Sequence, residues 1–315
     1  MLGGSFASAD NTFGLNITDG LSSTTSVKVA DQGDWILSGV STFTGDLTLR
    51  NTAEAIIGGS GQLGAGNYAG NVVMVNSSKF TYDSSADQVI SGVISGINTS
   101  NQVRHDGTGD LTLTGTNTYI GATTIAGGGT LYINGDNSGA TGAVDVKFGS
   151  TLGGTGTVGG ATTIDSTSFL SPGDGGIGTL TFSSIVDVSS AGANSMLFDL
   201  ASPGFSDLVS MSSSELDIGS GSFDLDAFTF TDLSGPGSRI GVGTYTLFDA
   251  DSLALGNSLG STVFTESLLG YATATLFESG GDIFLSVTAV PEPSSTALLG
   301  LGGLALMLRR KRSAA

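Results

Sequence analysis

The 315 residues include 51 glycines and 39% hydrophobic but only 12% charged residues, so the chain can bury a core, and its Gly and β-branched content favours an all-β fold over a helical one. The formal net charge is −18, from 10 basic and 28 acidic residues, which excludes nucleic acid as a partner because phosphate must be neutralised by Lys and Arg. The absence of cysteine excludes disulfides, thiolate metal sites and cysteine nucleophiles.

The first 30 residues are predicted to form an irregular N-terminal segment. Met1 to Asp10 lack the positive start of a secretory signal, and they lack its apolar run of roughly 7–15 residues. If the protein is exported, we therefore expect this start to be truncated.

Residues 37–49 and 113–125 repeat one pattern. Each copy has an apolar residue followed by a Gly, an aromatic residue between polar ones, a second Gly, and a short alternating strand. Phe43 in the first copy takes the place of Tyr119 in the second. Self-similarity of this kind is typical of repeat architectures.

Short alternating strands continue this pattern along the chain. Leu111 and Leu113 are predicted to point inward and Thr112 and Thr114 outward, because strand side chains alternate. Gly115 and Gly121 are expected to lie at turns. Further short strands are predicted within residues 130–135, 144–146, 150–158 and 162–164. Strands this short are stable only when stacked, so residues 31–184 are predicted to form a β-solenoid with one continuous core.

Residues 107–131 resemble the autotransporter-associated β-strand repeat, and the segments around Leu152 to Val158 and Leu170 to Leu180 resemble the coils that follow such repeats. The resemblance implies a right-handed parallel β-helix on a secreted or surface protein.

Residues 185–289 have longer alternating strands with aromatic residues on the expected inner face. They are predicted to form a β-rich continuation of the solenoid or a cap, which would cover its exposed strand edges and core. The predicted strands lie within residues 197–200, 223–226, 228–230, 245–248, 274–277 and 283–287.

Three signals follow one another in residues 290–315. They are Val290-Pro291-Glu292-Pro293, an uncharged apolar run at residues 296–308, and the basic cluster Arg309, Arg310, Lys311 and Arg312. The prolines disfavour regular structure. The apolar run, as a helix, would span ~20 Å of a hydrocarbon core of about 30 Å, and the cluster would stay on the cytoplasmic side. The alternative is a short buried helix with a solvated basic end.

This tail resembles the PEP-CTERM sorting signal of Gram-negative bacteria that produce exopolysaccharide, which is also named as the C-terminal domain of ice-binding proteins. The resemblance implies that an exosortase recognises Pro291-Glu292-Pro293 and removes the helix. It implies an exported protein that is transiently anchored in the inner membrane through lipid contact and then reaches the cell surface or extracellular matrix, with exopolysaccharide as a partner.

Four other features are candidate sites. His105-Asp106 suggests a catalytic dyad, but His105 is expected in a polar turn. Clustered carboxylates or a Lys or Arg base would serve a carbohydrate-active β-helix, with Lys28, Arg50, Lys79, Arg104, Lys147 and Arg239 as the available bases. Oxygen donors of Asp217, Asp224, Asp226 and Asp232 suit calcium, although an exposed strand edge explains them as well. An outward row of Thr112, Thr114, Thr116, Thr123 and Thr124 suggests an ice-binding face.

The sequence thus predicts a non-catalytic, exported protein with a structural or adhesive role and no catalytic, cofactor or metal site. A carbohydrate-active β-helix enzyme and an ice- or crystal-binding solenoid remain the alternatives.

Overall fold

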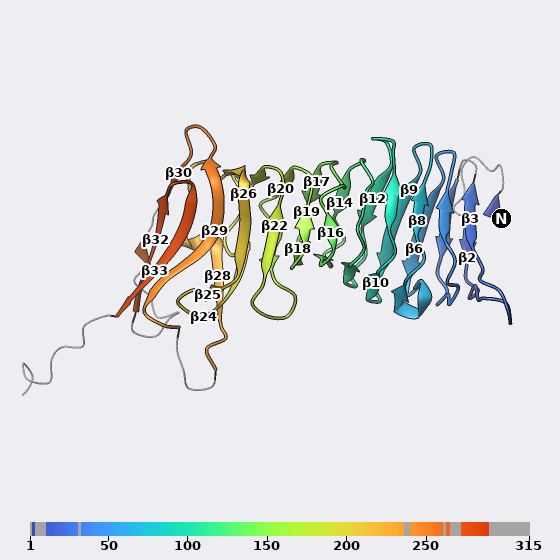
Figure 1. The fold of residues 1–315 in the computed structure, drawn as a ribbon, viewed down its shortest axis with the longest axis horizontal. Coiled ribbons are helices and arrows are strands. Elements are labelled where there is room, and N and C mark those ends of the chain that lie inside the picture. Colours follow the sequence, from blue (N-terminus) through green and yellow to red (C-terminus); the bar gives the residue numbers. More distant parts are fainter. Residues whose placement is uncertain are drawn as a thin grey trace, which may run out of the picture.

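The computed structural model describes residues 2–3, 11–30, 33–235, 240–260, 263–264 and 272–289. These residues contain no α-helix and form an elongated stack of short strands, in which the chain advances along the long axis from β2 to β33 (Figure 1). Most neighbouring strands pair in parallel, one coil upon the next, as the repeats predict. The all-β prediction is confirmed.

Three sheets run along the stack. Sheet 1 contains β1 (Leu2–Gly3), β3 (Val27–Ala30), β5 (Leu47–Leu49), β8 (Val72–Met74) and β11 (Ile94–Gly96). Sheet 2 contains β7 (Asn67–Tyr68), β10 (Gln88–Ile90), β13 (Leu111–Leu113), β15 (Thr130–Ile133), β18 (Thr151–Gly154), β21 (Phe169–Pro172), β24 (Met196–Ser202), β25 (Phe205–Ser206) and β28 (Phe228–Asp232).

Sheet 3 is the longest and has two rows of parallel strands that meet at one long strand. One row is β2 (Asn11–Phe13), β4 (Asp34–Leu37), β6 (Glu54–Gly59), β9 (Lys79–Ser84), β12 (Gln102–His105), β14 (Thr123–Ile125), β17 (Val144–Val146), β20 (Thr162–Ile164) and β23 (Val186–Asp187). The other is β16 (Asp136–Asn137), β19 (Thr157–Val158) and β22 (Thr179–Phe182). Both rows pair with β26 (Leu208–Asp217).

Antiparallel pairing appears toward the C-terminal end of the stack. β24 and β25 form the first antiparallel pair of strands along the described chain. Beyond β26, β29 (Gly243–Leu253) continues in parallel, and β33 (Asp282–Ala289), β32 (Ala272–Ser279) and β31 (Val263–Phe264) add to it in antiparallel fashion. A small separate sheet pairs β27 (Ser220–Phe223) with β30 (Ser258–Leu259). Two short 3-10 helices complete the elements, η1 (Gly64–Gly66) and η2 (Leu225–Ala227).

One hydrophobic core fills the stack, and it runs without a break from Val27 to Val287. Leu111 and Leu113 are fully buried, while Thr112 between them is half-buried on the outer side. Burying each such Leu contributes about 1.5–3 kcal/mol, so stability accumulates coil by coil.

The two copies of the sequence repeat share their local conformation. Phe43 and Tyr119 both point into the core, and each is followed by a three-residue strand. Those strands, however, lie in different sheets, because β5 pairs with β3 and β8 whereas β14 pairs with β12 and β17. The repeat therefore encodes a strand-corner-strand unit and not a fixed place in the coil.

Gly115 and Gly121 lie at corners as predicted, but their role is close packing between coils. A Cβ atom at Gly121 would lie 1.3 Å from the carbonyl oxygen of Asn101, and one at Gly115 would lie 2.3 Å from that of Gly92. No side chain fits at either position. The two coils therefore approach each other too closely at these glycines to admit a Cβ atom.

The strand predicted at residues 223–226 is wrong. β27 ends at Phe223, and Leu225–Ala227 form η2, whose first turn begins where the Asp224 carboxylate accepts the backbone N–H of Asp226 at 3.0 Å. This hydrogen bond satisfies a backbone N–H of the first helical turn that would otherwise be unpaired. It competes with the backbone pairing that a strand would need. The predicted exposure of Asp226 is confirmed.

Candidate functional site

The residues predicted to carry sorting lie outside the described residues. They are Val290, Pro291, Glu292 and Pro293, the apolar run 296–308, and Arg309, Arg310, Lys311 and Arg312. Within the part of the chain that the structure describes, no helix is long and apolar enough to cross a bilayer.

His105 is the last residue of β12 and is only 1% exposed, so its predicted place in a polar turn is wrong. Its Nδ1 lies 3.4 Å from the carbonyl oxygen of Tyr82, and its Nε2 lies 3.2 Å from that of Thr130. Those carbonyls belong to the coils on either side. Burial lowers the pKa of His105 below its usual value. The ring thus lies between two neighbouring coils, and its neutral form donates its one N–H to one of the two carbonyls.

The catalytic dyad that the adjacent His105 and Asp106 suggest is not formed. The guanidinium of Arg104 holds Asp106 Oδ2 instead, through Nη2 at 2.7 Å and Nε at 2.9 Å. Asp106 Oδ1 is buried without a hydrogen-bond partner among the described residues. Each ring nitrogen of the imidazole faces a backbone carbonyl inside the core, so neither is open to take a proton from a substrate.

The basic residues are engaged in ion pairs or lie apart. Lys79, Arg104 and Lys147 project from sheet 3 and pair with Glu54, Asp106 and Asp145 at 3.8, 2.7 and 3.0 Å. Lys28 lies on β3 of sheet 1, Arg50 directly follows β5, and Arg239 is outside the described residues. Three of the five described bases are thus paired with a carboxylate.

The four aspartates considered for calcium are not gathered into one site. The described residues contain no group of three or more His, Cys, Asp or Glu side chains that could hold a metal ion. Three of the carboxylates instead accept a local backbone N–H, and one of these is Asp224, which accepts that of Asp226 at 3.0 Å. Asp217 accepts the backbone N–H of Gly219 at 3.0 Å, and Asp232 accepts that of Ser234 at 2.8 Å.

The predicted row of outward Thr residues is wrong as a single face. Thr123 points inward, is buried, and shares a 2.8 Å hydrogen bond with the Tyr119 hydroxyl. Thr112 lies on sheet 2 and Thr124 on sheet 3. Along sheet 2 the positions in register with Thr112 are Val89 and Tyr132, so the Thr pattern does not continue from coil to coil.

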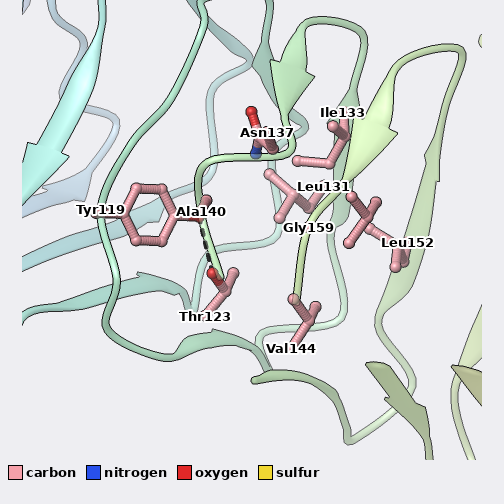
Figure 2. Close-up of a pocket in the computed structure, with 10 residues that line it drawn as sticks. Tyr119, Thr123, Leu131, Ile133, Asn137, Ala140, Val144, Leu152 and Gly159 are labelled. Atoms are coloured by element: carbon pink, nitrogen blue, oxygen red, sulfur yellow. Dashed lines mark hydrogen bonds between the residues drawn. The ribbon is translucent and has the colours of Figure 1, made fainter. Parts of the chain in front are cut away.

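A small cavity lies inside the coils next to Thr123 (Figure 2). It offers ≈ 10 Å³ to the centre of a water molecule, which is roughly room for one water. Tyr119, Asn137, Leu131, Ile133 and Val144 are among the residues that line it. A space of this size holds no substrate and belongs to the packing of the core.

The outer face of sheet 2 differs from that of sheet 3 in its side chains. The strands β10, β13, β15, β18 and β21 carry no Lys or Arg. Tyr132 and Phe169 project from this face and are half-buried. A Cβ atom at Gly153, the partner of Tyr132 in the next coil, would lie 3.2 Å from the Tyr132 ring. Gly153 therefore leaves the space in which the ring lies along the face.

Polar groups surround the Tyr132 ring. Burial raises the pKa of the Tyr132 hydroxyl, and the charges of Asp110 and Asp174 raise it further. Asn134, two residues along the same chain, donates to Asp174 Oδ2 at 2.7 Å and accepts the backbone N–H of Thr155 at 3.0 Å. An aromatic ring with carboxylate and amide acceptors beside it is suited to contact hydroxyl-rich ligands.

Asp207 is a buried carboxylate that the sequence interpretation missed. It is 1% exposed and lies between β25 and β26. Its Oδ1 accepts the backbone N–H of Gly178 at 2.8 Å, and its Oδ2 accepts that of Asp199 at 2.7 Å. The one signal in the sequence is that Leu208, the next residue, begins an alternating strand pattern. This pattern indicates that position 207 is close to a core strand.

Comparison with known proteins supports two parts of the sequence interpretation. Over 112 residues, which are 35% of this chain, the sequence is 44% identical to a Brucella suis biovar 1 (strain 1330) protein named Adhesin BmaC autotransporter. That stretch is 3% of the adhesin, so this chain spans a small part of its relative's length. The similarity agrees with the predicted autotransporter-type repeats.

The second comparison concerns the tail. The family profile described as the PEP-CTERM protein-sorting motif matches residues 289–312. The match begins at the last residue of β33, Ala289, and contains both the Pro-Glu-Pro sequence and the basic cluster. This chain therefore carries a PEP-CTERM protein-sorting motif directly after the last described strand, and 112 of its residues are similar to part of an autotransporter adhesin.

Proposed function

We propose that this is an exported, non-catalytic protein of the cell surface or exopolysaccharide matrix, with a structural or adhesive role. The observation that carries the proposal is the sorting motif at residues 289–312, which starts where β33 ends. The similarity to an adhesin supports a surface role. The paired bases and the enclosed His105 favour a non-catalytic body over a carbohydrate-active enzyme.

The tail works in three steps in this proposal. An exosortase recognises Val290, Pro291, Glu292 and Pro293, residues 296–308 form a short helix in the lipid of the inner membrane, and Arg309, Arg310, Lys311 and Arg312 remain on the cytoplasmic side. Removal of the helix then releases the body to the cell surface. The host would be a Gram-negative bacterium, in line with the sorting system.

The body divides into parts that match these roles. The parallel stack already includes β2 and β3, so it starts within residues 1–30, for which an irregular segment was expected. We assign residues up to 184 to a right-handed parallel β-helix, residues 185–289 to its β-rich continuation or cap, and residues 290–315 to the sorting tail. The parallel pairing through β23 and the antiparallel pairing of β29 with β33 support this division.

Processing of the tail tests the sorting step. Residues 290–315 are fused to a secreted reporter and expressed in cells with and without an exosortase. We expect a shift to a smaller size only when the exosortase is present, and loss of this shift in Glu292→Ala. Ser295→Ala in the same reporter, which leaves the Pro-Glu-Pro sequence intact, is the matched control and is expected to process normally. Unchanged mobility of the reporter in both strains would remove the proposal.

The adhesive role is assigned to the outer face of sheet 2. Tyr132 and Phe169 offer ring surface, and Asp110 offers a carboxylate that can accept short and strong O–H···O⁻ bonds from sugar hydroxyls. The face has no cation, so it favours neutral over anionic polysaccharide. Affinity electrophoresis in gels that contain dextran or alginate tests this. We expect retardation by dextran that Tyr132→Ala abolishes and Thr163→Ala, on sheet 3, retains. Equal mobility of both variants and the parent protein in dextran would contradict it.

A further inference from the structure

Asp207 lies where the parallel stack gives way to the first antiparallel pair of strands. Its carboxylate bridges two segments that are distant in sequence, since it binds the N–H of Gly178 before β22 and the N–H of Asp199 on β24. The backbone adds to the same joint, because Asp207 N–H donates to the Asp199 carbonyl at 2.8 Å and Leu208 N–H donates to the Gly178 carbonyl at 3.0 Å.

The third wall of this joint is the loop at residues 173–178. Gly173 lies so close that a Cβ atom there would be 3.2 Å from Asp207 Oδ1, and its backbone φ of +92° also favours glycine. Gly173 and Gly154 exchange two backbone hydrogen bonds of 2.8 Å. Asp207 is thus closed in by the loop, by β24 and by the start of β26.

No cation compensates this carboxylate among the described residues. The ion pairs found there involve Glu54, Asp106 and Asp145 and not Asp207. The titratable groups on the elements packed around Asp207 are Asp174 in the loop, Asp199 on β24, Glu215 and Asp217 on β26, and Tyr245, Asp249 and Asp251 on β29. The negative charge of each of these carboxylates would disfavour ionisation of Asp207. A buried, uncompensated carboxylate favours its neutral form.

We propose that Asp207 is a pH-sensitive latch, which holds residues 173–178 and β24 against the start of β26 and loosens when its carboxyl group loses its proton. Ionisation places a charge in an enclosed site with two N–H donors and no counter-ion. Ionisation therefore lowers the free energy of opening this joint, because water can solvate the charge once the joint is open. Burial, which outweighs the two hydrogen bonds, raises the pKa of Asp207 to about 7, and the Asp199 charge adds to this. The latch therefore responds near neutral pH, and it tightens on acidification.

Amide hydrogen exchange of the full chain measures this opening directly. The Gly178 and Asp199 amides report on the joint, and the Ile94 amide is the control because its acceptor, Asn117 Oδ1 at 2.7 Å, does not titrate. After correction for the intrinsic exchange rate, the opening constant of the two reporters is expected to rise about tenfold per pH unit from pH ~5 and to level off above pH ~7. The Ile94 amide is expected to show no such rise.

Two variants separate the latch from a general effect of pH. Asp207→Asn cannot ionise, so its reporter amides are expected to lose the pH dependence. Asp199→Asn keeps the Asp207 carboxyl but removes a neighbouring charge, so the midpoint is expected to move to lower pH. If Asp207→Asn fails to fold, the carboxyl carbon signal of Asp207 in the parent protein and in Asp199→Asn gives the same midpoints. Opening constants that stay flat between pH 5 and 9, or an Asp207 carboxyl midpoint near the usual value of about 4, would overturn the proposal.

Discussion

The Asn117 amide donates to Asn137 Oδ1 at 2.7 Å, so one buried side chain joins the same position of two successive coils. Its own Oδ1 accepts the backbone N–H of Ile94 at 2.7 Å on the preceding coil. Asn117 therefore connects three coils through a single amide. Buried polar groups connected in this way fix the register of the stack, because any shift would leave them unpaired.

Replacement of Asn117 by Ala is expected to lower the free energy of unfolding by about 2–4 kcal/mol, since the buried Ile94 N–H and Asn137 Oδ1 both lose a partner. Urea unfolding measures the change. The matched control is Thr116→Ala, the exposed residue before it, for which we expect less than about 0.5 kcal/mol. A similar loss in both variants would argue against a special role for the amide.

Glycine substitutions test the close approach of the coils. Gly121→Ala would place a Cβ atom 1.3 Å from the Asn101 carbonyl oxygen. The coils must separate to relieve this overlap, and we expect a loss of more than about 3 kcal/mol or failure to fold. Gly176→Ala, where nothing lies within 4 Å of the new atom, is expected to be neutral. Thermal unfolding of the two variants compares them, and equal midpoints would contradict the assigned packing role.

His105 predicts an acid-sensitive contribution to stability. Burial is the main cause that lowers its pKa below 6.5, and it outweighs the hydrogen bonds to Tyr82 and Thr130 and the charges of Asp110 and Asp106. The unfolded chain thus takes up a proton more readily than the folded one. The contribution of the neutral ring is complete above about pH 6.5 and is lost as the pH falls through the folded pKa.

The measurement for His105 is direct, because it is the single histidine of the sequence. One imidazole signal in NMR spectra is expected to titrate with a midpoint below 6.5, and His105→Phe is expected to reduce the loss of stability between pH 6.5 and 5. A midpoint at or above 6.5 would contradict the burial argument. Asp207 acts with the opposite sign, since its raised pKa makes stability fall as the pH rises.

Phe148 offers a stabilising substitution. It has a backbone φ of +56° and is 72% exposed, so it carries left-handed backbone strain without the benefit of burial. Asn adopts this conformation more readily. We expect Phe148→Asn to raise the free energy of unfolding by about 0.5–1 kcal/mol, measured in urea. Phe43→Ala, at a buried aromatic position, is the contrasting variant and is expected to lose about 3–5 kcal/mol.

The strands were predictable where local pattern decides structure. The alternation around Leu111 and the short apolar segments up to Ile164 predict β13, β14, β15, β17 and β20 closely, because inward side chains repeat every second residue. The segment 150–158 forms two strands, β18 and β19, and β16 (Asp136–Asn137) was not predicted. The pattern fails at Asp224, where a side-chain hydrogen bond starts a helical turn. It also fails at Thr123, because a threonine next to a buried Tyr hydroxyl can point inward.

The candidate sites were less predictable, because they depend on contacts between coils. Nothing near Asp207 in the sequence shows that Gly178 and Asp199 converge on it. His105 next to Asp106 suggested a dyad, but neighbours in a strand point to opposite sides, so the ring enters the core and the carboxylate meets Arg104. The sorting motif could be recognised without the fold, because it is defined by the order of its parts along the chain.

The last described strand, β33, lies at one tip of the elongated stack, far from β2 (Figure 1). Any attachment made through residues that follow Ala289 would fix the molecule to a surface by that end of the stack. The coils around β2 would then reach farthest from the anchoring surface. Added or lost coils would change the distance between the coils around β2 and that surface, and would leave the attachment unchanged.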